Sequence, residues 1–309
     1  MTREEFALFL KSLRDAEKKG LDTDAIVKAH EHENVYIYND ACLKKIFASE
    51  KNIALTTDLV NASLNLVGDN RVENPKLVNP FIPGELGYRN SEPDLVLVNE
   101  RENGQPRDRI SIEVQHEGGL TFKNRVVLYV SRLSSNMVKK SEPPILENLN
   151  LVVFQFFDVY PWRVSRNYRH SIQLRNQEQL LYYDKQTITV IEVKKFFSKA
   201  KYFASDDSRL AQWLRAIDTL NRGADFSEFA NDPIFGVLQE EAKLSNFSSR
   251  YLMMEGMTMT DAMYLVYNER EKIARNLLKN GHSPKDIARN TELPLSFVYE
   301  IKKALERGY

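Results

Sequence analysis

The stretch that most constrains the fold of this chain runs from residue 93 to residue 133 and reads as strand, turn, strand and helix. Residues 94–98 begin with an acid and continue as an apolar run, which is typical of a buried strand. Residues 109–115 alternate, so that Glu113 and Gln115 share one face while isoleucines and a valine share the other. Asn103-Gly104 between the runs is a hairpin signal. We therefore predict a hairpin that carries Asp94 at the start of one strand and Glu113 with Gln115 on its neighbour.

Acidic side chains placed in this way can share a divalent metal ion. Mg²⁺ takes a few hard oxygen ligands and fills its remaining positions with water and phosphate. The alternative is that Asp94 and Glu113 are ordinary polar positions near a strand end.

The order of motifs resembles a known family. Pro93-Asp94, then Glu113-x-Gln115, then a helix with Phe122-x-x-Arg125 and Tyr129, is similar to the PD-(D/E)xK nuclease superfamily. More narrowly, it resembles the branch of recombination-promoting nucleases and transposases, which has E-x-Q where most relatives have E-x-K. The resemblance extends to the segments 40–47, 149–157, 169–174, 187–193 and 277–284.

The resemblance implies an α/β fold with a restriction-endonuclease-like core. Its order is α-β-β-β-α-β, with a central mixed sheet flanked by helices and with helical additions at both ends. The chain supplies this order through predicted helices at 41–47 and 52–66, a strand at 76–81, the hairpin, a helix at 120–137 and a strand at 149–157. We divide it into an N-terminal helical extension (1–34), a nuclease-like core (35–204) and a helical C-terminal region (205–309).

The same resemblance implies metal-dependent hydrolysis of phosphodiester bonds. Asp94, Glu113 and the backbone carbonyl of Val114 would hold Mg²⁺ or Mn²⁺, which would polarise a phosphoryl oxygen and activate a water. Asp40 would help to orient the metal or its water, or would simply be a helix N-cap.

Gln115 stands where most relatives have lysine. Glutamine can hold a water or donate to a phosphate oxygen but carries no charge. Either Lys123 or Arg125, near the start of the next helix, supplies the missing charge, or the enzyme is slow.

These expectations describe a DNA endonuclease associated with recombination or mobile elements. The rival hypothesis is a DNA-binding or assembly scaffold that keeps the nuclease fold with little catalysis. RNA stays open as a substrate, and cutting of both strands would favour a homodimer.

Composition limits where nucleic acid can bind. The formal net charge is zero, so any such surface must come from local clustering. Residues 162–175 interleave arginines with Trp162 and Tyr168, which suits phosphate contacts and base stacking or else a solvated loop. One cysteine, no long apolar run and no signal peptide predict a cytoplasmic protein without a membrane span.

The last part of the chain reads as helices that end in a helix-turn-helix. Ser283 is the expected N-cap of the first helix, Pro284 its first residue, and the second helix runs from 295 to 305. Such a pair could present Ser296 and Tyr299 to a DNA groove. The alternative is a packing or dimer element.

Overall fold

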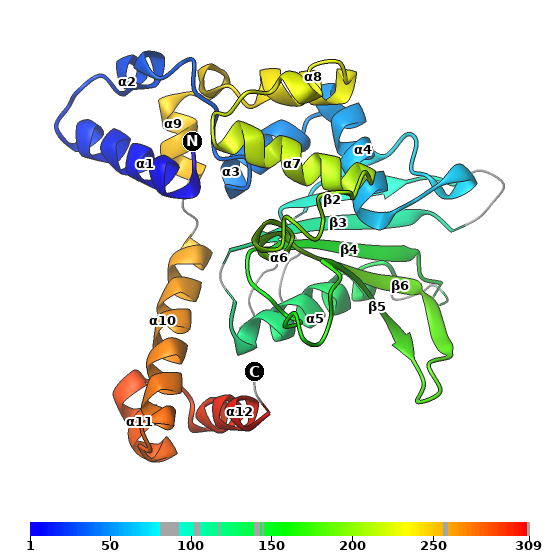
Figure 1. Ribbon diagram of the computed structural model, residues 1–309, viewed down its shortest axis with the longest axis vertical. Coiled ribbons are helices and arrows are strands. Elements are labelled where there is room, and N and C mark those ends of the chain that lie inside the picture. Colours follow the sequence, from blue (N-terminus) through cyan, green and yellow to red (C-terminus); the bar gives the residue numbers. More distant parts are fainter. Residues whose placement is uncertain are drawn as a thin grey trace. The chain divides into compact units, whose positions relative to one another are not determined.

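A six-stranded mixed sheet organises the molecule, with strand order β1-β2-β3-β4-β6-β5 (Figure 1). The computed structural model describes residues 1–80, 93–101, 106–116, 118–138, 143, 145–255 and 259–307. The strands are β1 (Lys76–Val78), β2 (Leu95–Asn99), β3 (Asp108–Gln115), β4 (Asn148–Gln155), β5 (Arg169–Arg175) and β6 (Leu181–Glu192). The predicted hairpin, crossover order and mixed sheet are confirmed.

Strand pairing brings the ends of several strands to one edge of the sheet. β2 pairs antiparallel with β3, with Leu95 opposite Ile112, although the predicted turn at Asn103-Gly104 lies outside the described residues. β3, β4 and β6 run parallel, and Gln115, Gln155 and Glu192 lie in register across their carboxyl ends. Because β2 is antiparallel to β3, its first residues lie at the same edge.

One face of the sheet packs on α3 (Asp40–Phe47), α4 (Ile53–Leu64) and α7 (Arg209–Asn221) (Figure 1). The apolar stripe of β3 joins this core, as its alternation predicts. Trp213 of α7 is fully buried, and its indole lies 6.0 Å from the ring of Phe47. The aromatic and aliphatic side chains of three helices thus fix the sheet from one side.

One helix start differs by one residue from the sequence prediction. Asn39, and not Asp40, is the N-cap of α3, since its side chain accepts from the N–H of Ala41 and of Cys42. Asp22 caps α2 (Thr23–Ala29) in the same way, by accepting from the N–H of Asp24 and of Ala25. Neighbouring Asn, Asp and Thr are all good caps, so the local sequence does not choose between them.

The N-terminal extension packs within the same unit as the sheet. The Ser249 hydroxyl donates to the Asp24 carboxylate over 2.6 Å, and the Val35 N–H donates to the Ala242 carbonyl over 2.9 Å. These bonds join α2 and its exit to the helices that follow α7. The remaining helices of this unit are α1 (Arg3–Lys18), α6 (Val193–Ser198), α8 (Pro233–Glu241) and α9 (Ser249–Glu255), with 3₁₀ turns at Glu50–Asn52, Gly68–Asn70, Ser227–Phe229 and Leu244–Asn246.

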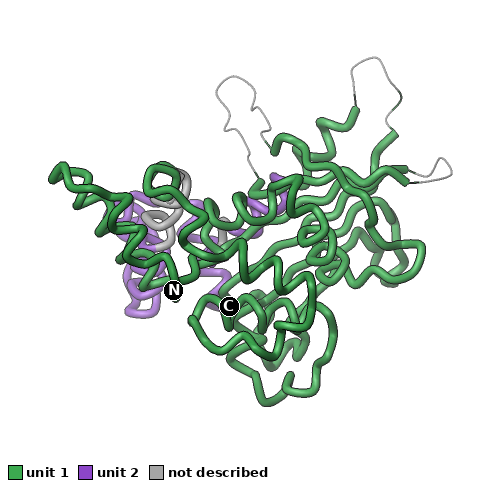
Figure 2. The backbone as a smooth tube through the Cα atoms, turned by 90° about the horizontal axis from the view of Figure 1, so that it is seen from above, with its two compact units in different colours: residues 1–115, 130–256 green, residues 116–129, 257–309 purple. Residues whose placement is uncertain are grey.

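The chain divides into two compact units, coloured separately in Figure 2. The first holds residues 1–115 and 130–256, and the second holds 116–129 and 257–309. Helix α5 (Leu120–Ser135) begins in the second unit, which also contains α10 (Met259–Lys279), α11 (Pro284–Thr291) and α12 (Leu295–Glu306). The predicted boundaries at 34/35 and 204/205 stay predictions. No helix of the described residues is long and apolar enough to cross a membrane.

Candidate active site

The two predicted acids, Asp94 and Glu113, lie side by side at the edge where β2 begins and β3 ends. The backbone N–H of Asp94 donates to Glu113 Oε1 over 3.3 Å. The N–H of Val114 donates to Asp94 Oδ2 over 2.8 Å. The exposed fractions are 7% for Asp94 and 4% for Glu113, so the two acids are both buried and adjacent.

A buried pair of this kind suits a hard divalent cation. Two neighbouring carboxylates repel each other, and burial makes their charges more costly, so a shared cation would stabilise both. Among the described residues, no cluster holds three or more His, Cys, Asp or Glu side chains. Two carboxylates with a backbone carbonyl nevertheless fit Mg²⁺, which usually keeps several waters and takes few protein ligands.

Gln115 lies two residues after Glu113, at the end of β3, and is half-buried. Its carbonyl accepts a hydrogen bond of 3.0 Å from the N–H of Phe156, the residue directly after β4. This bond and the register with Gln155 fix the backbone of Gln115 at the same sheet edge. The amide therefore occupies the strand position that the E-x-Q pattern predicts.

The residues next to Asp40 place the start of α3 near this edge of the sheet. The ring of Tyr38, two residues before Asp40, packs against Phe156 with centroids 4.9 Å apart. Since Phe156 is bonded to Gln115, the start of α3 lies against the carboxyl end of β4. The role of Asp40 at a metal stays a prediction.

Lys123 and Arg125, the candidates for the missing charge, lie on the part of α5 that belongs to the second unit. The Arg125 guanidinium donates to the Tyr129 hydroxyl over 3.2 Å and lies over its ring. The tyrosine of the motif therefore orients the arginine one helical turn away. Their contribution to a reaction at Asp94 and Glu113 stays a prediction.

A second buried acid, Glu192, lies at the end of β6 on the same sheet edge and was not singled out from the sequence. Its carboxylate contacts the ammonium of Lys195 on α6, and His170 Nε2 lies 2.9 Å from it. It also accepts from the N–H of Tyr160 over 3.0 Å. Burial raises the pKa of Glu192, but the hydrogen bonds from His170 and Lys195 outweigh it, and the pKa lies below its ordinary value.

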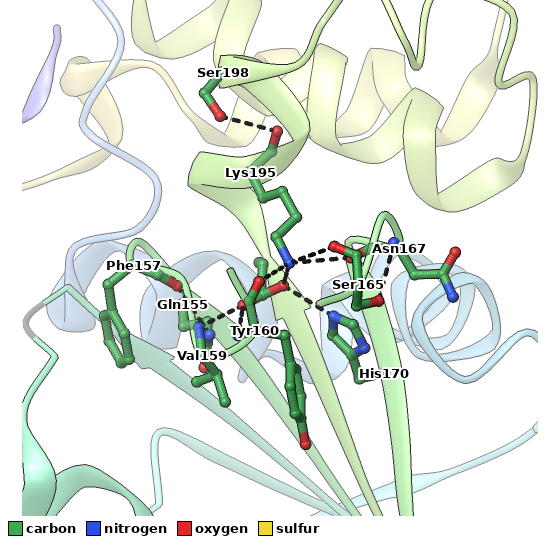
Figure 3. A network of polar contacts seen from close by, with 10 residues as sticks. Gln155, Phe157, Val159, Tyr160, Ser165, Asn167, His170, Lys195 and Ser198 are labelled. Atoms are coloured by element: carbon green, nitrogen blue, oxygen red, sulfur yellow. Dashed lines mark hydrogen bonds and ion pairs between the residues drawn. The ribbon is translucent and has the colours of Figure 1, made fainter. Parts of the chain in front are cut away.

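Lys195 ties this acid to the loop that follows β4 (Figure 3). Its ammonium donates to the carbonyls of Tyr160, Ser165 and Asn167, and its exposed fraction is 1%. With all its protons directed to oxygens, Lys195 holds the loop in place and is not a free cation for chemistry.

The Glu192 site has a sequence signal that could have revealed it. Glu192 follows a run of β-branched residues at 187–191, and Glu192-Val193-Lys194 reads literally as E-x-K. Lys194 is exposed, however, while Lys195 is the lysine that reaches the acid. The structural ion pair at the end of β6 is thus formed with Lys195 and not with the lysine of the literal motif.

In the basic segment 162–175 the aromatic rings are packed, whereas most of the arginines are exposed. Trp162 packs edge-on against Tyr202 with centroids 5.0 Å apart, and the Tyr168 hydroxyl donates to Asp206 over 2.8 Å. His170 is engaged by Glu192. These rings serve the packing of the loop, whereas Arg166 is exposed beside them.

Comparison with known proteins agrees with the fold and with the hairpin. The model of a family described as PD-(D/E)XK nuclease family transposase matches residues 37–276. This range includes every predicted catalytic and metal-binding residue and confirms the resemblance, while α1, α2 and the tail from residue 277 lie outside it. No curated protein and no solved structure matches the chain.

Proposed function

Because the chain belongs to the PD-(D/E)XK nuclease family transposases, we propose that it is a metal-dependent DNA endonuclease associated with recombination or mobile elements. The observation that carries this proposal is the buried, adjacent pair of Asp94 and Glu113 at the carboxyl edge of the sheet. A nuclease that hydrolyses phosphodiesters with a metal needs such a pair of hard oxygen donors.

In this proposal, Asp94, Glu113 and the carbonyl of Val114 hold Mg²⁺ or Mn²⁺. The bound ion supplies Lewis-acid chemistry, which polarises a phosphoryl oxygen and lowers the pKa of a water. The N–H of Val114 fixes the Asp94 carboxylate, and the N–H of Asp94 fixes that of Glu113, so both acids are oriented before a metal arrives. Asp40 orients a water at the same edge.

Gln115 takes the place of a charged donor. Its amide holds a water or donates to a phosphate oxygen, and Lys123 or Arg125 supplies positive charge near the transferring phosphate. If neither does, the loss of one charged donor would cost about 2–4 kcal/mol of transition-state stabilisation.

The second candidate function is a DNA-binding or assembly scaffold with little catalysis. The uncharged Gln115 and the zero formal net charge favour it. Within the endonuclease proposal, DNA is the substrate with RNA as the alternative, a homodimer would cut both strands, and the lone thiol Cys42 suits the cytoplasm.

Cleavage of supercoiled plasmid DNA with Mg²⁺ and with Mn²⁺ tests the proposal. We expect the wild type to nick or linearise the plasmid and Glu113→Ala to lose at least about 100-fold in rate. Glu240→Ala, an exposed acid on α8, is the matched control and should cleave as the wild type does. Equal inertness of wild type and Glu113→Ala, with DNA still shifted on a gel, would support the scaffold instead.

A Gln115→Lys variant then tests whether the absence of a positive charge at this position limits the rate of cleavage. We expect faster cleavage, because an ammonium at this position would stabilise the charge that develops on the phosphate. An unchanged rate would mean that another cation already acts there. Parallel assays on single-stranded RNA decide between the two substrates.

A further inference from the structure

The C-terminal helices form a small unit with its own core. Ala274, Ile287, Leu293, Val298 and Ile301 are buried together, and apolar side chains from all three helices pack around them. α11 and α12 lie entirely beyond residue 276, where the family match ends. The three helices therefore share a core of their own, most of which lies beyond the matched range.

Helices α11 and α12 are joined by a turn of Glu292, Leu293 and Pro294. Glu292 has the left-handed conformation, with φ of 54°, and its carboxylate contacts the Arg270 guanidinium of α10. Ser283 caps α11, as the sequence predicts, by accepting from the N–H of Asp286 over 3.2 Å. Two short helices fixed across a three-residue turn are the elements of a helix-turn-helix.

The two sides of α12 differ in chemistry. Val298, Ile301 and Leu305 form the side that faces the core. On the opposite side, three- and four-residue steps place Ser296, Tyr299, Lys303 and Arg307 in one exposed stripe. This side contains two polar side chains toward the start of the helix and two cations toward its end, and it also carries the exposed Glu300 and Glu306 one turn from Ser296 and Lys303.

The charges of this unit divide into paired and unpaired sets. Arg270, Arg275 and Arg289 are used in ion pairs with Glu292, Glu271 and Asp286. In the described part of the tail, the cations without an ion pair are Lys279, Lys285, Lys302, Lys303 and Arg307. Between residues 269 and 307 the acids without one are Glu300 and Glu306, so the excess of unpaired charge in this range is positive and suits a polyanion.

We propose that α12 is a recognition helix that binds duplex DNA in the major groove. Ser296 and Tyr299, near its start, face base edges, and Lys303 and Arg307 contact phosphates. The stripe is too polar for the apolar core of a stable dimer interface, which argues for DNA over a second copy of the chain. The inference does not depend on Asp94 and Glu113, so it can fail or hold independently of the nuclease proposal.

Binding of the full chain to labelled duplex DNA in EDTA measures this surface without cleavage. For Lys303→Glu/Arg307→Glu we expect at least about 10-fold weaker binding and a salt dependence reduced by about two phosphate contacts. Lys11→Glu/Lys18→Glu makes the same change in charge on exposed positions of α1 and should bind as the wild type does. Unchanged affinity and salt dependence in the α12 variant would overturn the proposal.

Selection from a random duplex pool tests the groove contacts. We expect the wild type to enrich a sequence motif that Ser296→Ala/Tyr299→Ala no longer enriches, with binding to random DNA retained. Circular dichroism establishes that each variant is folded. If the α12 variants change self-association in sedimentation and leave DNA binding intact, the helix is a contact between copies and the DNA assignment is wrong.

Discussion

Two buried acidic sites lie along the same edge of the sheet and are built in opposite ways. At the end of β6, Glu192 is neutralised by Lys195 and His170, and the same lysine binds three carbonyls of the adjoining loop. At the β2–β3 hairpin, Asp94 and Glu113 lie beside each other, oriented by backbone N–H groups. In the first arrangement a carboxylate pairs with a buried lysine, whereas in the second two carboxylates are adjacent.

This difference teaches which acid can bind a cation. A carboxylate already paired with a buried lysine gains little from a metal, and breaking its pair is costly. Two neighbouring carboxylates gain from a divalent ion, because the ion removes their mutual repulsion. Glu192, although it begins a literal E-x-K sequence, therefore has a structural role through Lys195, and the E-x-Q sequence at Glu113 is the candidate for chemistry.

The largest expected effect comes from removing the cation at the structural site. Lys195→Met leaves Glu192 with a buried charge deprived of its main partner, and we expect a loss of about 3–5 kcal/mol in the free energy of unfolding. Urea denaturation measures it. The matched control is Lys195→Met/Glu192→Gln, in which both charges are gone and the loss should be much smaller. A single-variant loss below about 1 kcal/mol would contradict the assignment.

Addition of metal should distinguish the two acidic sites by its effect on stability. If Asp94 and Glu113 bind Mg²⁺ or Mn²⁺, saturating metal raises the stability of the wild type by about 2.7 kcal/mol at 100 times the Kd. The same addition should leave the stability of Glu113→Gln unchanged, because one of the two carboxylates is missing. Thermal denaturation with and without EDTA tests this, and an equal shift in both proteins would place the metal elsewhere.

Neutralising one acid in the metal-free protein should have a smaller effect on the free energy of unfolding, opposite in sign to that of Lys195→Met. Glu113→Gln removes like-charge repulsion and should stabilise the fold by about 1 kcal/mol while it abolishes metal-dependent cleavage. Glu192→Gln should instead destabilise it, because Lys195 loses its counter-charge. If both variants shift the denaturation midpoint in the same direction, the contrast between the sites fails.

The smallest effect is a pH dependence at Glu192. Its folded pKa lies below its ordinary value of 4.5, so its contribution to stability is complete above that value and is lost as pH falls through the folded pKa. The difference in unfolding free energy between wild type and Glu192→Gln should therefore shrink on acidification below pH 4.5. A difference that stays constant there would show that the pKa is not lowered.

The hairpin could be predicted from the sequence because the two strands are specified by patterns of residues that are close together in the chain. The apolar run before Asn99 and the alternation around Glu113 specify buried strands, and the predicted strand at 109–115 differs from β3 by one residue. Helix caps were less determined. Asn39 and Asp40 are both able to cap α3, and only the path of the entering chain makes Asn39 the cap.

The sequence by itself determined the order of elements, the family, and the placement of two acids on neighbouring strands. The roles of Asp40, Gln115, Lys123 and Arg125 stay predictions. Only the tertiary structure decided that Glu192, Lys195 and His170 meet, because β6, α6 and β5 contribute one residue each. In a medium of low polarity, the neighbours that folding brings to a carboxylate govern its charge. Glu192 meets a lysine and a histidine, whereas Asp94 meets Glu113.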